Sequence, residues 1–252
     1  MWGNTRMIVL TAISAALYAA ILIPFKVVPL IPGITEFRPA NAVPVVCSFL
    51  FGPAAAWGAA FGNLIGDFFG GLGPGDLFGF VGNLLYGLVP YLLWQAVTDA
   101  DPVPQSATTW IGLLAVIAVA AALCATIVGW GLHLLGFHPF TVLATIVLVN
   151  NLVVAAILSP FLLTLLYPRI RDARLLYRDL LEPRPRLPAW RAVVGVALVV
   201  AGTAGAFAAG QLIASGRWVP PWAPFASVSR APEVGFGLIP PLGVVVLGLF
   251  LL

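Results

Sequence analysis

The sequence predicts an all-α fold: a polytopic membrane helical bundle with a six-helix core plus two additional C-terminal transmembrane helices. Of its 252 residues, 61% are hydrophobic and only 8% are charged, against about 45–50% and about 25% in soluble domains. The mean hydropathy is +1.06, and several apolar runs approach the ~20 residues that cross a bilayer. These runs are continuous, whereas the strands of a β-barrel alternate in short segments.

The first apolar run, Met7–Val28, is expected to be a membrane helix rather than a cleaved leader, because the apolar stretch continues past its small residues to Ile31. A polar stretch, PGITEFRPANAVPVV (32–46), follows it. Shorter apolar segments at Asn41–Phe51 and Ala54–Phe69 flank an "FGP" break. Both are predicted as helices 2 and 3 of the core.

Small residues repeat every four positions in helix 3 and in the fourth predicted helix, Asp76–Val97. The repeat runs through Gly58, Gly62, Gly66 and Gly70, and then through Gly75, Gly79, Asn83 and Gly87. This spacing gives a flat face on which membrane helices approach closely. We therefore expect helices 3 and 4 to be tightly packed.

Four further apolar segments complete the bundle. Thr109–Leu135 and Pro139–Tyr167 are predicted as helices 5 and 6, and Ala192–Ala214 and Val234–Leu252 as a two-helix extension. The chain then divides into a six-helix membrane section (1–168), a basic linker (169–191) and a membrane extension (192–252).

The arginines predict that the N-terminus is cytoplasmic. Arg6 and the seven arginines between positions 169 and 191 supply eight of the 12 basic residues, and they fall on one side when the N-terminus is inside. Most of the unusual polar residues of the core then lie toward the outer side.

These polar residues are the candidate substrate-binding residues. They come from the loop after helix 1, from both sides of the "FFGGLGPG" turn, from the turn between helices 5 and 6, and from inside helices 4 and 6. The set is Glu36, Arg38, Asn41, Asp67, Asp76, Asn83, His133, His138, Asn150 and Asn151. The alternative is structural, because amides in hydrocarbon need partners and another helix can supply them.

Catalytic and metal motifs are absent from the sequence. It has no P-loop, GxSxG, HExxH or cysteine pair. We read Cys47 and Cys124 as packing residues, and we assign no metal site to His133 and His138. We therefore expect no cofactor, no enzymatic activity and no nucleic-acid partner, and any ATP-driven step requires partner proteins.

The alanine-rich first helix, the polar loop into a short second helix, and "FLFGPAAAWGAAFGNLIGDFFGGLGPGD" together resemble the substrate-binding S component of an energy-coupling-factor (ECF) transporter. The resemblance covers about residues 5–170. The two C-terminal segments and the Arg-rich linker depart from the six-helix pattern.

The resemblance implies high-affinity uptake of a water-soluble vitamin or related micronutrient through a multi-pass protein of the prokaryotic cell membrane. It implies a pocket at the outer ends of helices 4–6 under a lid that carries Glu36, Arg38 and Asn41. It also implies that a face with Ala12, Ala16 and Ala20 docks to a transmembrane coupling subunit, and that a pair of cytoplasmic ATPases hydrolyses the ATP.

Two other functions remain open from the sequence. One is an intramembrane enzyme that uses Glu36, Asp67 or Asp76 with a histidine, which needs an acid and a base at one point. The other is a solitary secondary transporter, for which an inverted repeat is typical; no clear repeat relates 1–125 to 126–252.

Overall fold

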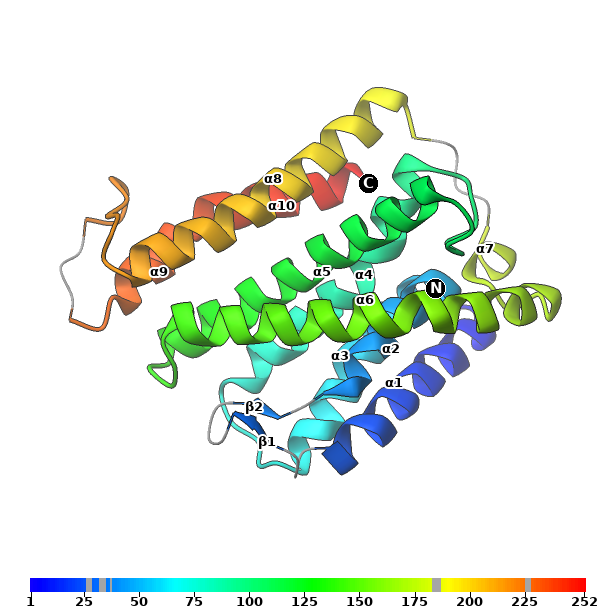
Figure 1. Cartoon of the computed structure of the whole chain (residues 1–252), viewed down its shortest axis with the longest axis horizontal. Helices are drawn as coiled ribbons and strands as arrows, with labels where there is room; N and C mark the ends of the chain where they lie inside the picture. Colours follow the sequence, from blue (N-terminus) through cyan, green and yellow to red (C-terminus); the bar gives the residue numbers. More distant parts are fainter. Residues whose placement is uncertain (26–28, 32–34, 37, 183–186, 225–227) are drawn as a thin grey trace.

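The computed structural model describes residues 1–25, 29–31, 35–36, 38–182, 187–224 and 228–252, with the backbone alone at 29–31 and 35–36. The elements in chain order are α1 (Thr5–Phe25), β1 (Pro29–Ile31), β2 (Thr35–Glu36), a 3₁₀ turn η1 (Pro39–Asn41), α2 (Ala42–Phe51), α3 (Pro53–Phe68), α4 (Asp76–Val97), α5 (Ala107–Leu134), α6 (Phe140–Asp172), α7 (Tyr177–Leu180), α8 (Ala189–Ala214), α9 (Ala231–Gly237) and α10 (Ile239–Leu251). The long helices run roughly along one axis (Figure 1).

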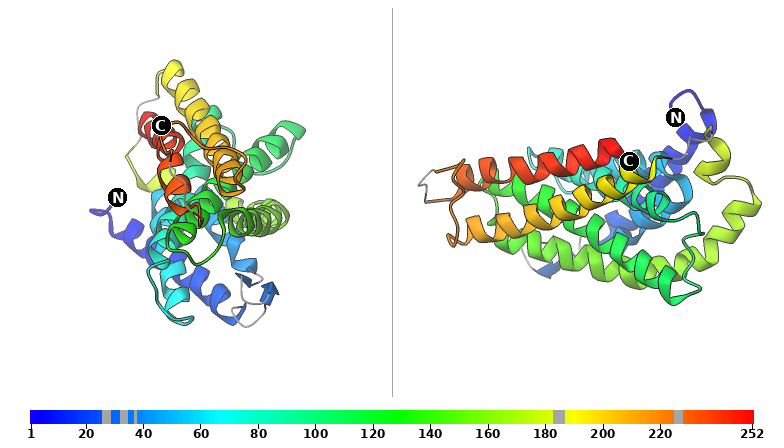
Figure 2. Two further views of the ribbon diagram at one scale, coloured as in Figure 1. Left: turned by 90° about the vertical axis from the view of Figure 1, so that its left-hand side faces the viewer. Right: turned by 90° about the horizontal axis from the view of Figure 1, so that it is seen from above.

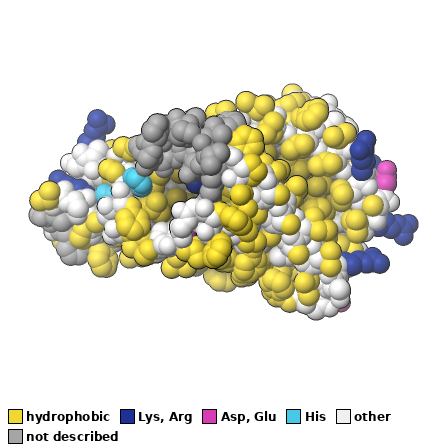
Figure 3. Space-filling model, turned by 90° about the horizontal axis from the view of Figure 1, so that it is seen from below, with side chains coloured by type: hydrophobic (Ala, Val, Ile, Leu, Met, Phe, Trp, Pro, Cys, Tyr) yellow, Lys and Arg dark blue, Asp and Glu magenta, His cyan; other side chains and the backbone are white. Residues whose placement is uncertain are grey.

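On the face shown in Figure 3, apolar side chains cover the middle of the molecule, and most of the visible charged side chains lie at its two ends. Within the described residues, six helical segments are long and apolar enough to cross a membrane: α1, α4, α5, α6 with α7, α8, and α9 with α10. The chain is therefore a multi-pass membrane protein. The six segments differ from the eight spans expected, because α2 and α3 have 10 and 16 residues and α3 is only about 24 Å long.

The bundle has two distinct ends (Figures 1 and 2). We call the end that carries the start of α1 the N-terminal end, and the opposite end, which carries β1 and β2, the hairpin end. The two strands pair antiparallel between α1 and α2, with Pro29 opposite Glu36. The loop between the first two helices therefore crosses the hairpin end of the core.

The predicted glycine face of α3 packs against α1. A Cβ atom added at Gly58 would lie 2.4 Å from the Ser14 Cβ, and one at Gly62 would lie 2.8 Å from the Ala15 carbonyl oxygen. Only glycine fits at such distances, so the two backbones approach closely. Gly70 lies in the turn beyond α3, outside this contact.

Helix α2 is buried along its whole length, between α4 and α6. The Ser48 hydroxyl donates to the Gly87 carbonyl at 2.5 Å and accepts from the Tyr91 backbone N–H at 3.1 Å. The Ser48 hydroxyl thus bridges the Gly87 carbonyl and the Tyr91 N–H, which lie four residues apart on α4. Both are close to Pro90, which supplies no N–H donor to the helix. A short helix inside the bundle needs no lipid-facing surface, which explains why α2 is shorter than a bilayer is thick.

Helices α8 and α10 form a pair that packs on α5, on the side of the core away from α1 (Figures 1 and 2). Glycines again set the contact, because a Cβ at Gly248 would lie 2.8 Å from the Val199 nitrogen. The predicted last helix is divided at Gly237–Ile239 into α9 and α10, where Pro240 and Pro241 supply no N–H.

Two other predicted boundaries differ from the structure. Helix α6 continues past Tyr167 through Pro168 to Asp172, so the basic linker begins as helix and also contains α7. Helix α1 is described as far as Phe25, and the last predicted residues of that helix, 26–28, lie outside the described part of the chain.

Replacing Gly87 by Ala should destabilise the bundle, because the new Cβ would lie 2.9 Å from the Ala56 Cα and 3.0 Å from the Ala55 carbonyl oxygen. We expect a loss of about 1–3 kcal/mol in the free energy of unfolding. Gly243→Ala is the matched control, since no atom lies within 4 Å of its added Cβ. Thermal unfolding in detergent, followed by tryptophan fluorescence, measures both; equal melting temperatures would contradict the close α3–α4 contact.

Candidate functional site

Polar side chains from four helices meet inside the core. The Tyr18 hydroxyl of α1 lies 3.0 Å from Oδ1 of Asn83 in α4 and 3.3 Å from Oδ1 of Asn41, which precedes α2. The Asn41 amide donates to Oδ1 of Asn151 in α6 at 2.6 Å. All four side chains are buried. We call Tyr18, Asn41, Asn83 and Asn151 the amide cluster.

The hydrogen bonds of the amide cluster are incomplete in one respect. A tyrosine hydroxyl has a single hydrogen to donate, while the oxygens of both Asn41 and Asn83 lie within its reach. It serves one of them fully at a time, so the other oxygen can accept a bond from a further donor. The Asn83 amide nitrogen donates to the carbonyl of Gly79 one turn earlier, at 2.9 Å.

Two more side chains border the cluster at α6. The Tyr86 hydroxyl of α4 donates to the backbone carbonyl of Asn151 at 3.2 Å, and the Cys124 thiol of α5 lies beside the Asn151 side chain. Both residues are buried. Asn151 is therefore fixed by contacts from η1, α4 and α5.

A positive and a negative charge lie beside the cluster. Arg38 precedes η1 and lies close enough to the Tyr18 hydroxyl and the Cys124 thiol to interact electrostatically with both. Asp67 of α3 also interacts with Tyr18, and it accepts a 2.5 Å hydrogen bond from the Asn63 amide. The loop after α1 thus places a cation beside the buried amides.

The structure brings together five of the residues proposed from the sequence: Arg38, Asn41, Asp67, Asn83 and Asn151. Asn150, the neighbour of Asn151, is buried as well. Residue Glu36 lies in β2, but its side chain falls outside what the structure describes.

Three other proposed residues make local contacts. The Asp76 carboxylate accepts from the Gly73 backbone N–H at 2.7 Å and closes the turn before α4. His133 Nδ1 accepts from the Phe140 N–H at 3.3 Å, and Phe140 belongs to a separate apolar cluster with α8 and α9. His138 lies in the same α5–α6 turn, half-buried. The side chains of Asp76 and His133 thus fix turns at the hairpin end.

The chemistry of the cluster suits recognition of a small polar molecule. Carboxamides offer donors and an acceptor, and the two tyrosines add hydroxyls and flat rings. Among the described side chains, no group of three or more His, Cys, Asp or Glu is placed to hold a metal ion.

Comparison with known proteins decides the family. The QueT transporter family matches residues 8–168, which cover α1 to α5 and most of α6. The chain belongs to the QueT transporter family. No curated protein and no solved structure matches it.

QueT proteins are S components of ECF-type transporters, as the sequence resemblance predicted. The chain is therefore a membrane transport component, and the alternative of an intramembrane enzyme is wrong. The family match ends at residue 168, so α7–α10 lie beyond the part that this QueT protein shares with its family.

Two members of the site were missed from the sequence. Tyr18 and Tyr86 lie in helices whose small residues dominate the pattern. The available signal was Tyr18 itself, the one aromatic hydroxyl of α1, on the face that also carries Thr11, Ser14, Ala15 and Ala19. That face is buried, whereas Ala12, Ala16 and Ala20 lie on the exposed face of α1 together with Ile13 and Leu17.

Removing the Tyr18 hydroxyl should destabilise this QueT protein. Tyr18→Phe removes the one hydroxyl donor that the buried oxygens of Asn41 and Asn83 share, so we expect a loss of about 1–3 kcal/mol in the free energy of unfolding. Tyr167→Phe is the control, because its hydroxyl donates to Asp101, whose side chain is 41% exposed and can bond to water instead. Thermal unfolding of both variants checks this, and a larger loss for Tyr167→Phe would argue against a buried Tyr18 network.

Proposed function

We propose that the chain is the substrate-binding subunit for uptake of a queuosine precursor, and that it works with a transmembrane coupling subunit and an ATPase pair in the prokaryotic cell membrane. The amide cluster beneath the α1–α2 loop carries this proposal. It is a polar site built from four helices in an otherwise apolar bundle, and the family is one of S components for queuosine precursors.

The chemistry of the cluster matches that of the substrate class. A queuosine precursor is a 7-deazaguanine base, whose edges carry N–H donors and a carbonyl acceptor as guanine does. The carboxamides of Asn41, Asn83 and Asn151 present the complementary groups. The base takes the place of the Asn41–Asn151 hydrogen bond and supplies the donor that one amide oxygen lacks.

Access to the cluster is proposed from the hairpin end, with the N-terminus in the cytoplasm. This orientation is favoured by Arg6 and by the described arginines between positions 169 and 191, which lie near the opposite end. The segment with β1, β2 and Arg38 then acts as the outer lid. Arg38 offers the ligand a rigid fork of donors beside Tyr18.

Coupling to the partner subunit is assigned to the exposed face of α1. Ala12, Ala16 and Ala20 recur every four residues, which leaves a shallow groove bordered by Ile13 and Leu17. A helix of another subunit packs closely on such a face. The sequence has no nucleotide-binding motif, so the partners hydrolyse the ATP.

A binding measurement tests the substrate site. Purified protein in detergent is titrated with 7-aminomethyl-7-deazaguanine and with guanine by isothermal titration calorimetry. We expect saturable binding of the precursor by the wild type. Asn151→Leu should bind it at least tenfold more weakly, because the substitution removes the side-chain amide that accepts a hydrogen bond from the buried Asn41 amide.

Gln211→Leu is the control for this experiment, since Gln211 is an exposed amide on α8 that bonds only to Thr145 of α6 among the described residues. It should bind as the wild type does. If the Asn151 variant keeps its melting temperature and binds the precursor as tightly as the wild type, the substrate site is not the amide cluster. Failure of the wild type to bind any deazaguanine would overturn the substrate assignment.

A second variant tests the docking face. Ala16→Trp should abolish co-purification with the coupling subunit and ATPases while leaving ligand binding unchanged, because the indole blocks close helix approach on α1. Ala197→Trp, at an exposed alanine of α8, is the matched control and should keep the complex. Loss of the complex in both variants, or in neither, would refute the assignment to α1.

A further inference from the structure

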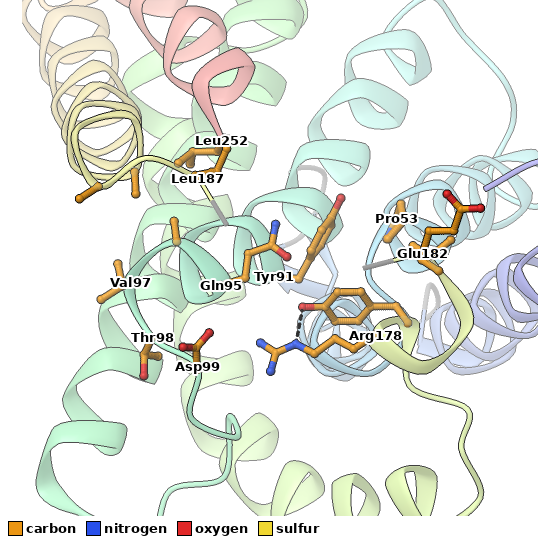
Figure 4. Close-up of a pocket in the computed structure, with 15 residues that line it drawn as sticks. Pro53, Tyr91, Gln95, Val97, Thr98, Asp99, Arg178, Glu182, Leu187 and Leu252 are labelled. Atoms are coloured by element: carbon orange, nitrogen blue, oxygen red, sulfur yellow. Dashed lines mark hydrogen bonds between the residues drawn. The ribbon is translucent and has the colours of Figure 1, made fainter. Parts of the chain in front are cut away.

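A cavity remote from the amide cluster lies at the N-terminal end. Its volume is about 750 Å³, and it is lined by the end of α4, by α7 and by the start of α8 (Figure 4). This is within the ~300–1,000 Å³ typical of ligand sites. Because α7 and α8 follow residue 168, most of this cavity lies outside the region matched by the family.

The cavity lies at the ends of helices long enough to cross a membrane, where lipid headgroups are expected. Three helix ends border it: Pro53 begins α3, Val97 ends α4 and Ala189 begins α8. Trp190, next in sequence, is 62% exposed, and tryptophans on the outside of membrane proteins gather at the interface.

One wall presents a cation. Arg178 of α7 donates through Nε to the Tyr177 hydroxyl at 3.1 Å, and Figure 4 shows its guanidinium extending into the cavity. A guanidinium has five N–H donors, so the terminal nitrogens can form a bidentate contact with a phosphate.

Acidic groups line the same space. Asp99, in the loop after α4, and Glu182, just after α7, both border the cavity. The Asp99 carboxylate and the Arg178 guanidinium point toward one opening (Figure 4). A purely anionic group would be repelled by these carboxylates, whereas a group with a phosphate and an ammonium satisfies both signs of charge.

The remaining wall is apolar and faces the bilayer. Val97, Ala192 and Leu252 line it, and Val97 is 69% exposed. An acyl chain gains from burial along this wall, but a free phosphate ion does not. The distribution of charge and apolar surface therefore matches an amphiphile.

We propose that this cavity binds a phospholipid whose headgroup carries both a phosphate and an amine, as phosphatidylethanolamine does. Arg178 holds the phosphate, Asp99 and Glu182 hold the ammonium, and one acyl chain lies against Val97 and Ala192. The lipid fills the space between the core and the α8–α10 pair at the N-terminal end.

Native mass spectrometry of the full chain, taken from nanodiscs of equal phosphatidylethanolamine and phosphatidylglycerol content, tests the proposal. The wild type should retain phosphatidylethanolamine preferentially. Arg178→Gln should reduce retention at least about fivefold, and Asp99→Asn should shift the preference toward phosphatidylglycerol. Arg169→Gln, at an exposed arginine outside the cavity, is the control and should behave as the wild type does.

Ala192→Phe narrows the cavity without changing its charge, so it should also reduce retention of phosphatidylethanolamine. This variant tests the site even if the Arg178 variant does not fold. Equal retention by Ala192→Phe and the wild type would overturn the site. Equal retention of the two lipids by the wild type would overturn the role of the amine. Displacement of the lipid by millimolar inorganic phosphate would show a phosphate site instead of a lipid site.

Discussion

The hydrogen bonds around Tyr18 hold this bundle in register. A polar side chain in an apolar interior costs several kcal/mol unless it is paired, and the partners here belong to α1, η1 before α2, α4 and α6. Sliding any one of these helices along its axis would break bonds to the others. The same bonds place three amides at one point, so the requirement that fixes the helices also builds the candidate site.

Close packing of the helix backbones brings the polar side chains near enough to form these hydrogen bonds. Gly58 and Gly62 bring α3 against α1, and the wholly buried α2 lies between α4 and α6. A ligand at the amide cluster must exchange the Asn41–Asn151 bond for its own. This exchange lowers affinity by the free energy of the internal bond. Without a ligand, however, that bond pairs the Asn41 amide with the Asn151 oxygen, and leaving both unpaired would be costlier still.

The two sides of the core are used differently. Helix α1 leaves Ala12, Ala16 and Ala20 exposed on one side, while α8 and α10 cover α5 on the other (Figure 2). The extension therefore leaves the proposed docking face open. At the N-terminal end it also borders the cavity with Arg178, where residues after 168, beyond the part matched by the family, supply polar groups.

The sequence by itself determined the membrane class, the helix order and the small-residue faces, because hydropathy and four-residue spacing are local properties. It also indicated Arg38, Asn41, Asn83 and Asn151 as unusual polar residues. Only the tertiary structure separated these from Asp76 and His133, whose side chains bond to their own turns. It alone added Tyr18 and Tyr86, because a hydroxyl on a helix face becomes part of a site only when a distant helix brings its partner within about 3 Å.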